Sequence, residues 1–140
     1  MASRRKSREL AVQMLYQWDI GKHSPHEVLS TSIAAEKRDQ PAEKFARQLF
    51  EGTVEDVSAI DALLREHAEN WKLERMAAID RNVLRLALFE LRHHPETPAA
   101  VVINEALEIA RRFSGHDSAE FVNGVLDAVR KALPPIGAPK

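Results

Sequence analysis

Residues 78–93, AIDRNVLRLALFELRH, are the most hydrophobic stretch of this 140-residue chain and decide its fold. Apolar residues would cover most of the circumference of a helix here: Ile79, Val83, Leu84, Leu86, Ala87, Leu88, Phe89 and Leu91. A helix that is apolar nearly all round is buried among other elements. Arg81, Arg85 and Arg92 leave only a narrow polar strip, and Pro95 ends the segment because the residue before a proline avoids the helical conformation. We therefore predict a central, buried helix.

Helical patterns also fill the sequence on both sides of this segment. Proline, glycine and capping residues mark their boundaries. In chain order these signals are Gly21, the capping sequence Ser24–Glu27, Pro41, an internal Gly52 that we expect to kink rather than stop its helix, Thr97–Pro98, Ser114–Gly115, the cap-like Asp117–Glu120, and Pro134–Pro135. The apolar pattern that starts at Pro41 continues to about Ala68. No alternating pattern of useful length predicts a strand. We expect a single all-α domain of six or seven helices in two halves, about 3–70 and 71–133, followed by a disordered tail at 134–140.

The composition excludes several classes of protein. The chain has no cysteine, which rules out disulfides, thiol catalysis and cysteine-ligated zinc. It contains neither a glycine-rich phosphate loop nor the motif of a serine nucleophile. Two groups have spacings that a metal could use, namely His23 with His26, and Glu90 with His93 and His94, but neither forms a complete site. Apolar runs are too short to cross a membrane. We expect a cytoplasmic protein that is not an enzyme and has no cofactor or metal.

The charge is balanced overall but not locally. Four cationic residues and no acid lie within residues 1–8, namely Arg4, Arg5, Lys6 and Arg8. Because the whole chain has a formal net charge of −1, the other residues carry −5. A basic arm on an acidic body suggests a polyanionic partner. The alternative is a solvated, frayed terminus.

Two aromatic residues lie on the helix that the basic arm enters. Trp18 continues the apolar stripe of Leu10 and Met14, which favours a place in the core. Tyr16 falls off this stripe, so burial and exposure are equally compatible with its position. An exposed aromatic side chain beside arginines could stack on an unpaired base.

Asn123–Gly124 interrupts the apolar pattern of the last predicted helix. Glycine at such a position costs about 1 kcal/mol relative to alanine. The sequence leaves two explanations open: close packing against another helix, or room for a ligand.

Four segments together resemble the NusB family of bacterial transcription antitermination factors. They are the arm with RELAVQMLYQW, then IDRNVLRLALFEL, PAAVVINEALEIARRF and HDSAEFVNGVLDAV, and the likeness is strongest at 4–18 and 79–129. The resemblance implies two three-helix subdomains packed side by side. It also implies binding to single-stranded boxA RNA of ribosomal RNA leader transcripts. The implied partners are a small-subunit ribosomal protein that doubles as an elongation factor, and an antitermination complex on RNA polymerase.

Position by position, the resemblance implies an RNA-binding site and a partner contact. The implied RNA-binding residues are Arg4, Arg5, Lys6, Arg8, Tyr16, Asp80, Asp117 and Phe121, and Glu105 is the implied contact with the ribosomal protein. Lys6 stands where arginine is common in the family, and lysine keeps the charge without planar stacking.

Two other classes of protein are alternatives to this resemblance. A similar helical domain accompanies an rRNA cytosine methyltransferase, but this sequence has neither a βαβ pattern nor a cysteine nucleophile. A helical protein-interaction module, or an inactive homodimer that hides the RNA face, stays open.

Overall fold

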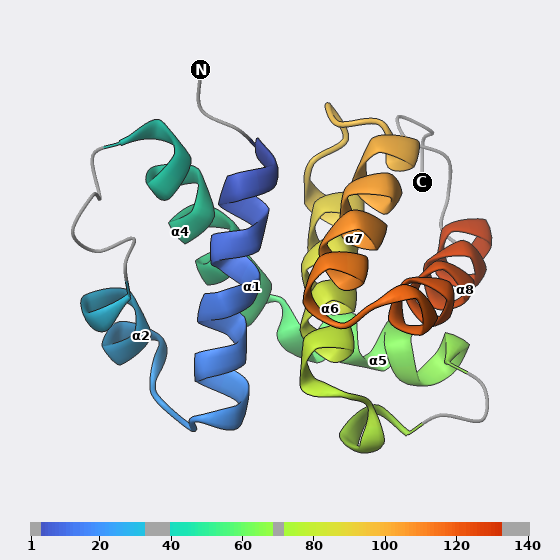
Figure 1. Ribbon diagram of the computed structural model, residues 1–140, viewed down its shortest axis with the longest axis horizontal. Helices are drawn as coiled ribbons and strands as arrows, with labels where there is room; N and C mark the ends of the chain where they lie inside the picture. Colours follow the sequence, from blue (N-terminus) through green and yellow to red (C-terminus); the bar gives the residue numbers. More distant parts are fainter. Residues whose placement is uncertain (1–3, 33–39, 69–71, 133–140) are drawn as a thin grey trace.

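The computed structural model describes residues 4–32, 40–68 and 72–132. Within these ranges it contains seven α-helices, one 3₁₀ turn and no strand, which confirms the all-α prediction (Figure 1). The elements are α1 (Arg4–Ile20), α2 (Pro25–Thr31), α4 (Pro41–Glu55), α5 (Val57–His67), η1 (Leu73–Arg75), α6 (Ala78–His93), α7 (Ala99–Phe113) and α8 (His116–Ala132). No helix in the described ranges is long and apolar enough to cross a membrane. The disorder expected for 134–140 lies outside the described residues.

Helix α6 is the centre of the molecule. It contacts α1 and α4 on one side and α5, α7 and α8 on the other (Figure 1). Every residue from 81 to 90 is buried, and Leu84 and Leu88 are completely inaccessible. The predicted central helix is thus confirmed. The prediction that three arginines form one polar strip was wrong in one respect. Arg81 and Arg85 are buried and paired with acids from other helices, whereas Arg92 stays at the surface.

The helices fall into two groups in space. Figure 1 shows α1, α2 and α4 together on one side, and α5, α7 and α8 on the other side with α6. Only Asp56 separates α4 from α5, yet α5 packs against α6 and α8. In space the division therefore falls at Asp56, earlier in the chain than the 70–76 segment between the two predicted halves. The sequence did not indicate a division here because no glycine or proline marks the turn of the chain at Asp56.

The glycines at 52 and 124 differ in their surroundings. A Cβ atom at Gly52 would lie 2.2 Å from Cζ of Phe89, so glycine allows α4 to approach α6 closely. Gly52 lies inside α4 and does not end it, as expected. Gly124 is exposed, and a Cβ there would meet nothing within 4 Å. The packing explanation of Asn123–Gly124 was therefore wrong.

Local signals fix two of the helix starts. Ser24 and Glu27 form the expected capping box at the start of α2, with each side chain bound to the backbone N–H of the other. At the start of α8 the expected cap was misplaced. Gly115 has a φ of +120°, which glycine alone adopts readily, and α8 already begins at His116. Asp117 thus lies in the first turn of the helix rather than capping it.

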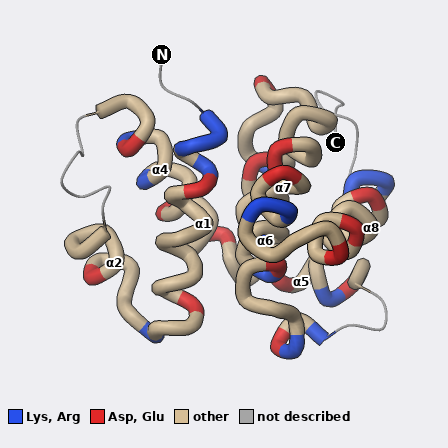
Figure 2. Tube along the Cα trace, in the orientation of Figure 1, with Lys and Arg blue, Asp and Glu red and all other residues tan. Residues whose placement is uncertain are grey.

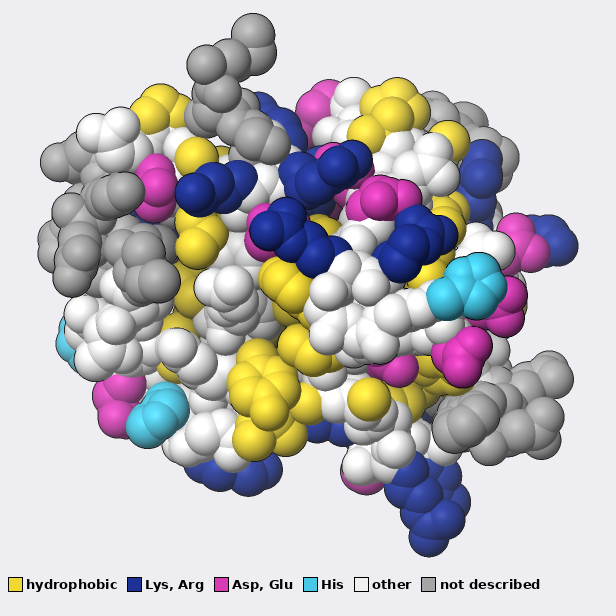
Figure 3. All heavy atoms as spheres, viewed as in Figure 1, with side chains coloured by type: hydrophobic (Ala, Val, Ile, Leu, Met, Phe, Trp, Pro, Cys, Tyr) yellow, Lys and Arg dark blue, Asp and Glu magenta, His cyan; other side chains and the backbone are white. Residues whose placement is uncertain are grey.

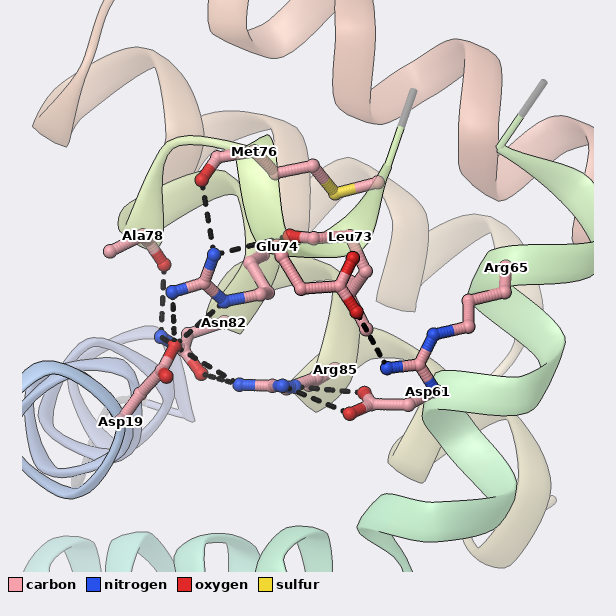
Figure 4. Close-up of polar contacts among 10 residues, drawn as sticks. Asp19, Asp61, Arg65, Leu73, Glu74, Met76, Ala78, Asn82 and Arg85 are labelled. Atoms are coloured by element: carbon pink, nitrogen blue, oxygen red, sulfur yellow. Dashed lines mark hydrogen bonds and ion pairs between the residues drawn. The ribbon is translucent and has the colours of Figure 1, made fainter. Parts of the chain in front are cut away.

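A largely buried ionic network joins α6 to α1, α5 and η1 (Figure 4). Oδ2 of Asp19 accepts hydrogen bonds from Arg81 Nε at 2.8 Å, Asn82 Nδ2 at 3.0 Å and Arg85 Nη1 at 3.1 Å. Arg85 also donates to both carboxylate oxygens of Asp61 at 2.9 Å. Burial alone would raise the pKa of Asp19, but these donors and charges outweigh it and lower that pKa.

Replacement of each helical glycine by alanine should have opposite effects on stability. Gly52→Ala places a methyl group against Phe89 and should lower the free energy of unfolding by about 1–3 kcal/mol through overpacking. Gly124→Ala, the matched control, should raise it by about 0.5–1 kcal/mol because alanine favours an exposed helix. Urea unfolding followed by circular dichroism measures both. A Gly52→Ala protein as stable as the wild type would contradict the close approach.

Asp19 should make stability depend on pH in acid. Because its folded pKa is lowered, its charge stabilises the protein above about pH 4 and this contribution is lost as the pH falls further. Asp19→Asn should therefore be destabilised at pH 7, and its difference from the wild type should narrow between pH 5 and pH 3 in urea unfolding. Asp127→Asn, which removes an exposed acid paired with Lys131, is the control and should show little difference at any pH. A gap that stays constant down to pH 3 would contradict the role of Asp19.

Candidate nucleic-acid interface

The basic arm is helical from its first described residue. Arg4, Arg5, Lys6 and Arg8 all lie in the first two turns of α1, while residues 1–3 lie outside the described ranges. Arg4, Arg5 and Lys6 are exposed, whereas Arg8 is buried. Figure 2 shows the resulting band of positive charge at this end of α1. Of these four cationic residues, three therefore lie at the surface and one lies in the core.

Arg8 connects α1 to the central helix. Its Nε and Nη2 atoms donate to the two carboxylate oxygens of Glu90 at 2.8 and 2.9 Å. The side chains of Arg8 and Glu90 are 5% and 2% exposed. Two opposite charges at this depth stabilise each other only as a pair. Arg8 therefore holds α1 in place and does not present its guanidinium group to solvent.

Arg5 lies one turn before Arg8 and reaches across to α7. Its Nη2 atom donates to Oε2 of Glu105 at 2.7 Å, and its Nε atom donates to the same oxygen at 3.1 Å. Oε1 of Glu105 lies 3.7 Å from Nη1 of Arg8. The hydrogen bond and charge of Glu105 raise the pKa of Arg5. Glu105, the expected contact with a ribosomal protein, therefore faces α1 and has a side chain only 16% exposed.

Further cations adjoin this pair. The guanidinium carbon of Arg4 lies 3.8 Å from the ring centroid of Phe45 on α4, a cation–π contact. Near the C-terminus of α7, Arg112 pairs with Glu9 of α1 at 3.0 Å, and Arg111 pairs with Glu108. Figure 3 shows Lys and Arg side chains gathered over the N-terminal part of α1 and over α7. We call Arg4, Arg5, Lys6, Arg111 and Arg112 the cationic face.

Arg111 and Arg112 were missed by the sequence analysis as members of such a face. The available signal was two adjacent arginines at the end of a predicted helix. That signal is ambiguous, because cations are favoured at any helix C-terminus. Only the side-chain pairs between α1 and α7, Arg5 with Glu105 and Arg112 with Glu9, show that this end of α7 adjoins Arg5.

Tyr16 shares the side of α1 that carries Arg5. Eleven residues are just over three full helical turns, so Tyr16 lies about 16 Å along the helix with nearly the same orientation. Tyr16 is 40% exposed, which settles the alternatives left by the sequence in favour of exposure. Trp18 instead packs against the core, and the guanidinium carbon of Arg85 lies 5.5 Å from its ring centroid. Trp18 is thus partly buried at the edge of the core, on the side that its apolar stripe predicted.

The remaining predicted residues lie where α6 and α8 begin. Asp80 is in the first turn of α6, and its carboxylate accepts a hydrogen bond from the Ser118 hydroxyl of α8. Asp117 is exposed beside Ser118. Phe121, one turn further along α8, is half-buried and packs against the core. The structure thus brings Asp80, Asp117 and Phe121 to one junction, with part of the Phe121 ring committed to the core.

The histidines do not form a metal centre in the described part of the chain, where no group of three potential ligands occurs. His93 and His94 lie at the C-terminus of α6, as expected. Nε2 of His93 is 2.8 Å from Asp56, and Nδ1 of His94 is 2.7 Å from Glu96. Burial alone would raise the pKa of Asp56, but hydrogen bonds from His93 and Arg92 lower it. These histidines are therefore hydrogen-bonded to carboxylates.

Fold and surface together define a class of protein: all-α, with two groups of helices that meet across one buried helix and share a cationic face. The model of the NusB family matches residues 5–131. The chain therefore belongs to the NusB family, a family of transcription antitermination factors and not of enzymes.

Individual relatives agree with this assignment over nearly the full length. The chain is 53% identical to the transcription antitermination protein NusB of Koribacter versatilis, covering 94% of this chain and 90% of the relative. It is 45% identical to that of Solibacter usitatus, with 99% and 96% covered. The solved structure of T. maritima NusB is 37% identical, covers 94% of this chain and 93% of its own, and has a TM-score of 0.84.

One solved structure shows a similar protein in a complex. It is described as antitermination factors NusB and NusE in complex with dsRNA. The similar chain in it is 27% identical, covers 93% of this chain and 97% of its own, and has a TM-score of 0.83.

Truncation of Arg5 and of Arg8 should separate a surface role from a structural one. Arg8→Ala leaves Glu90 buried without its partner and should lower the free energy of unfolding by about 3–5 kcal/mol. Arg5→Ala, the same change three residues earlier, should leave the melting temperature almost unchanged because Arg5 is exposed. Thermal melts of the two proteins test this. Equal losses of stability would show that both arginines serve the core.

Proposed function

We propose that this chain binds boxA-type single-stranded RNA of ribosomal RNA leader transcripts. It would do so together with a NusE-type partner, the small-subunit ribosomal protein that the family resemblance implies. The resulting complex would act on RNA polymerase during antitermination, in the bacterial cytoplasm. The observation that carries the proposal is the cationic face lying on the same side of α1 as the exposed ring of Tyr16.

The cationic face is suited to the phosphate backbone. Arg4, Arg5 and Lys6 are consecutive residues in the first turn of α1, and Arg112 adjoins them from α7. Cations at such spacing neutralise successive phosphates, and this part of the affinity falls as salt increases. It carries no sequence information, because every RNA has the same phosphates. Arg8 has a different part in the proposal: it holds α1 in position and does not contact RNA.

Recognition of bases requires other groups, which lie further along α1 and near the starts of α6 and α8. Tyr16 offers an exposed ring, and Phe121 offers the part of its ring that the core leaves uncovered. Unpaired bases stack on such rings. Asp117 and Asp80 offer carboxylate oxygens that can accept hydrogen bonds from base amino groups. In this proposal Ser118 orients the carboxylate of Asp80.

The partner is supported by likeness to the NusB chain of the solved complex with NusE and dsRNA. That complex supports a protein partner and an RNA in one assembly, while the single-stranded boxA element rests on the family resemblance. The position of Glu105, turned toward α1, favours a role within the cationic face over a contact with the partner.

Removal of the surface cations and removal of Phe121 should have separable effects on RNA binding. The triple variant Arg4→Ala, Arg5→Ala and Lys6→Ala should weaken binding to boxA RNA and to a scrambled RNA about equally. Its log–log salt dependence should become shallower by about 0.7 for each phosphate that the variant no longer neutralises. Phe121→Ala should instead weaken binding to boxA by about 1–3 kcal/mol and narrow the difference between the two RNAs. Fluorescence anisotropy at several salt concentrations measures both effects.

Arg65→Ala is the control for the cations, since Arg65 is an exposed arginine of α5 paired with Glu74. It should change neither affinity nor salt dependence. Melting temperatures accompany each measurement. A triple variant that binds like the wild type would refute the cationic face as the RNA site. A lowered melting temperature of Phe121→Ala with an unchanged preference for boxA would leave Phe121 as a core residue only.

A further inference from the structure

The cationic face contains an acid at the position where a phosphate would bind. Both Nε and Nη2 of Arg5 donate to Oε2 of Glu105, at 3.1 and 2.7 Å. This is the edge of a guanidinium group that matches the oxygens of a carboxylate or a phosphate. A phosphate that binds Arg5 by the same edge must therefore replace Glu105 as the acceptor of these hydrogen bonds.

The two partners differ in how far they can move. Glu105 has a side chain 16% exposed, with Arg8 3.7 Å away on its inner side, whereas the side chain of Arg5 is 50% exposed. Arg8 is in turn fixed to Glu90. Glu105 is thus held by the fold, and Arg5 is the member of the pair that can reorient. The exchange of carboxylate for phosphate needs only a rotation of the Arg5 side chain.

We infer that Glu105 is a built-in competitor of the RNA phosphate backbone for Arg5, an inference that rests on the proposed function. The carboxylate lowers the affinity of the cationic face for any single-stranded RNA by the same factor. It therefore sets an affinity threshold and leaves base preference unchanged. Below this threshold, RNA that contacts only the cations dissociates, and RNA that also engages base-reading groups stays bound.

Glu105→Gln isolates this role because glutamine keeps the shape and a hydrogen-bond acceptor but loses the charge. The variant should bind boxA RNA and scrambled RNA about two- to fivefold more tightly, the range expected when a surface ion pair no longer competes. The ratio of the two affinities should stay constant. The salt dependence should steepen by up to about 0.7, the value for one additional phosphate neutralised on a single strand.

A double-mutant cycle with Arg5 makes the test specific. In the Arg5→Ala background, Glu105→Gln should have no effect on affinity, because the competed cation is absent. Glu74→Gln is the matched control: it removes the same charge where Glu74 pairs with Arg65, outside the cationic face. It should change neither affinity nor salt dependence in either background. Circular dichroism and melts verify folding, and Glu105→Ala provides a second variant whose salt dependence should also steepen.

The outcomes distinguish the inference from the proposal on which it rests. Tighter binding by Glu105→Gln that disappears in the Arg5→Ala background supports the competitor. An equal gain in that background, or an equal gain from Glu74→Gln, overturns it in favour of a general charge effect. If Glu105→Gln binds both RNAs only as tightly as the wild type, the inference is overturned and the proposed function is not. A wild-type protein with no salt-dependent affinity for either RNA overturns the proposed function and the inference with it.

Discussion

The burial of α6 on all sides is the constraint on which the rest of the structure depends. A buried charge is tolerated only when it is paired, so each polar group on this helix requires a partner from a neighbour. Helix α1 supplies one at each end: Arg8 pairs with Glu90, and Asp19 pairs with Arg81 and Arg85. The two attachments are eleven residues apart on α1, about 16 Å, and hold it antiparallel to α6.

Two fixed points on one helix determine its rotation as well as its position. A turn of α1 by a single residue, about 100°, would pull both Arg8 and Asp19 away from their partners. The opposite side of the helix is fixed by the same contacts, so Arg5, Glu9 and Tyr16 must lie along the edge that adjoins α7 and solvent. The core ion pairs thus position the surface proposed to bind RNA, although they do not belong to it.

The sequence was informative where local chemistry decides the structure. The apolar circumference of α6 and the capping box at Ser24 were both predictable from neighbouring residues. The partners of α6 were not, because Asp19 and Arg81 are 62 residues apart and no local pattern relates them. Arg8 is an intermediate case. It was grouped with Arg5 by charge, yet it lies one turn before Val12 and two turns before Leu15, on the buried stripe of α1.

Two ion pairs join α1 to α7, Arg5 with Glu105 and Arg112 with Glu9. They explain how a chain with a net charge of −1 can carry a cationic face. In both pairs the acid is the less exposed member. The side chains of Glu105 and Glu9 are each 16% exposed, whereas those of Arg5 and Arg112 are 50% and 67% exposed. The acids neutralise the long-range field that would attract any polyanion, since paired charges cancel at a distance. The arginines still present themselves at short range, where geometry decides the contact. Under the proposed function, attraction to RNA would then depend less on steering from afar than on close fit, which would suit a protein that must ignore most of the transcripts around it.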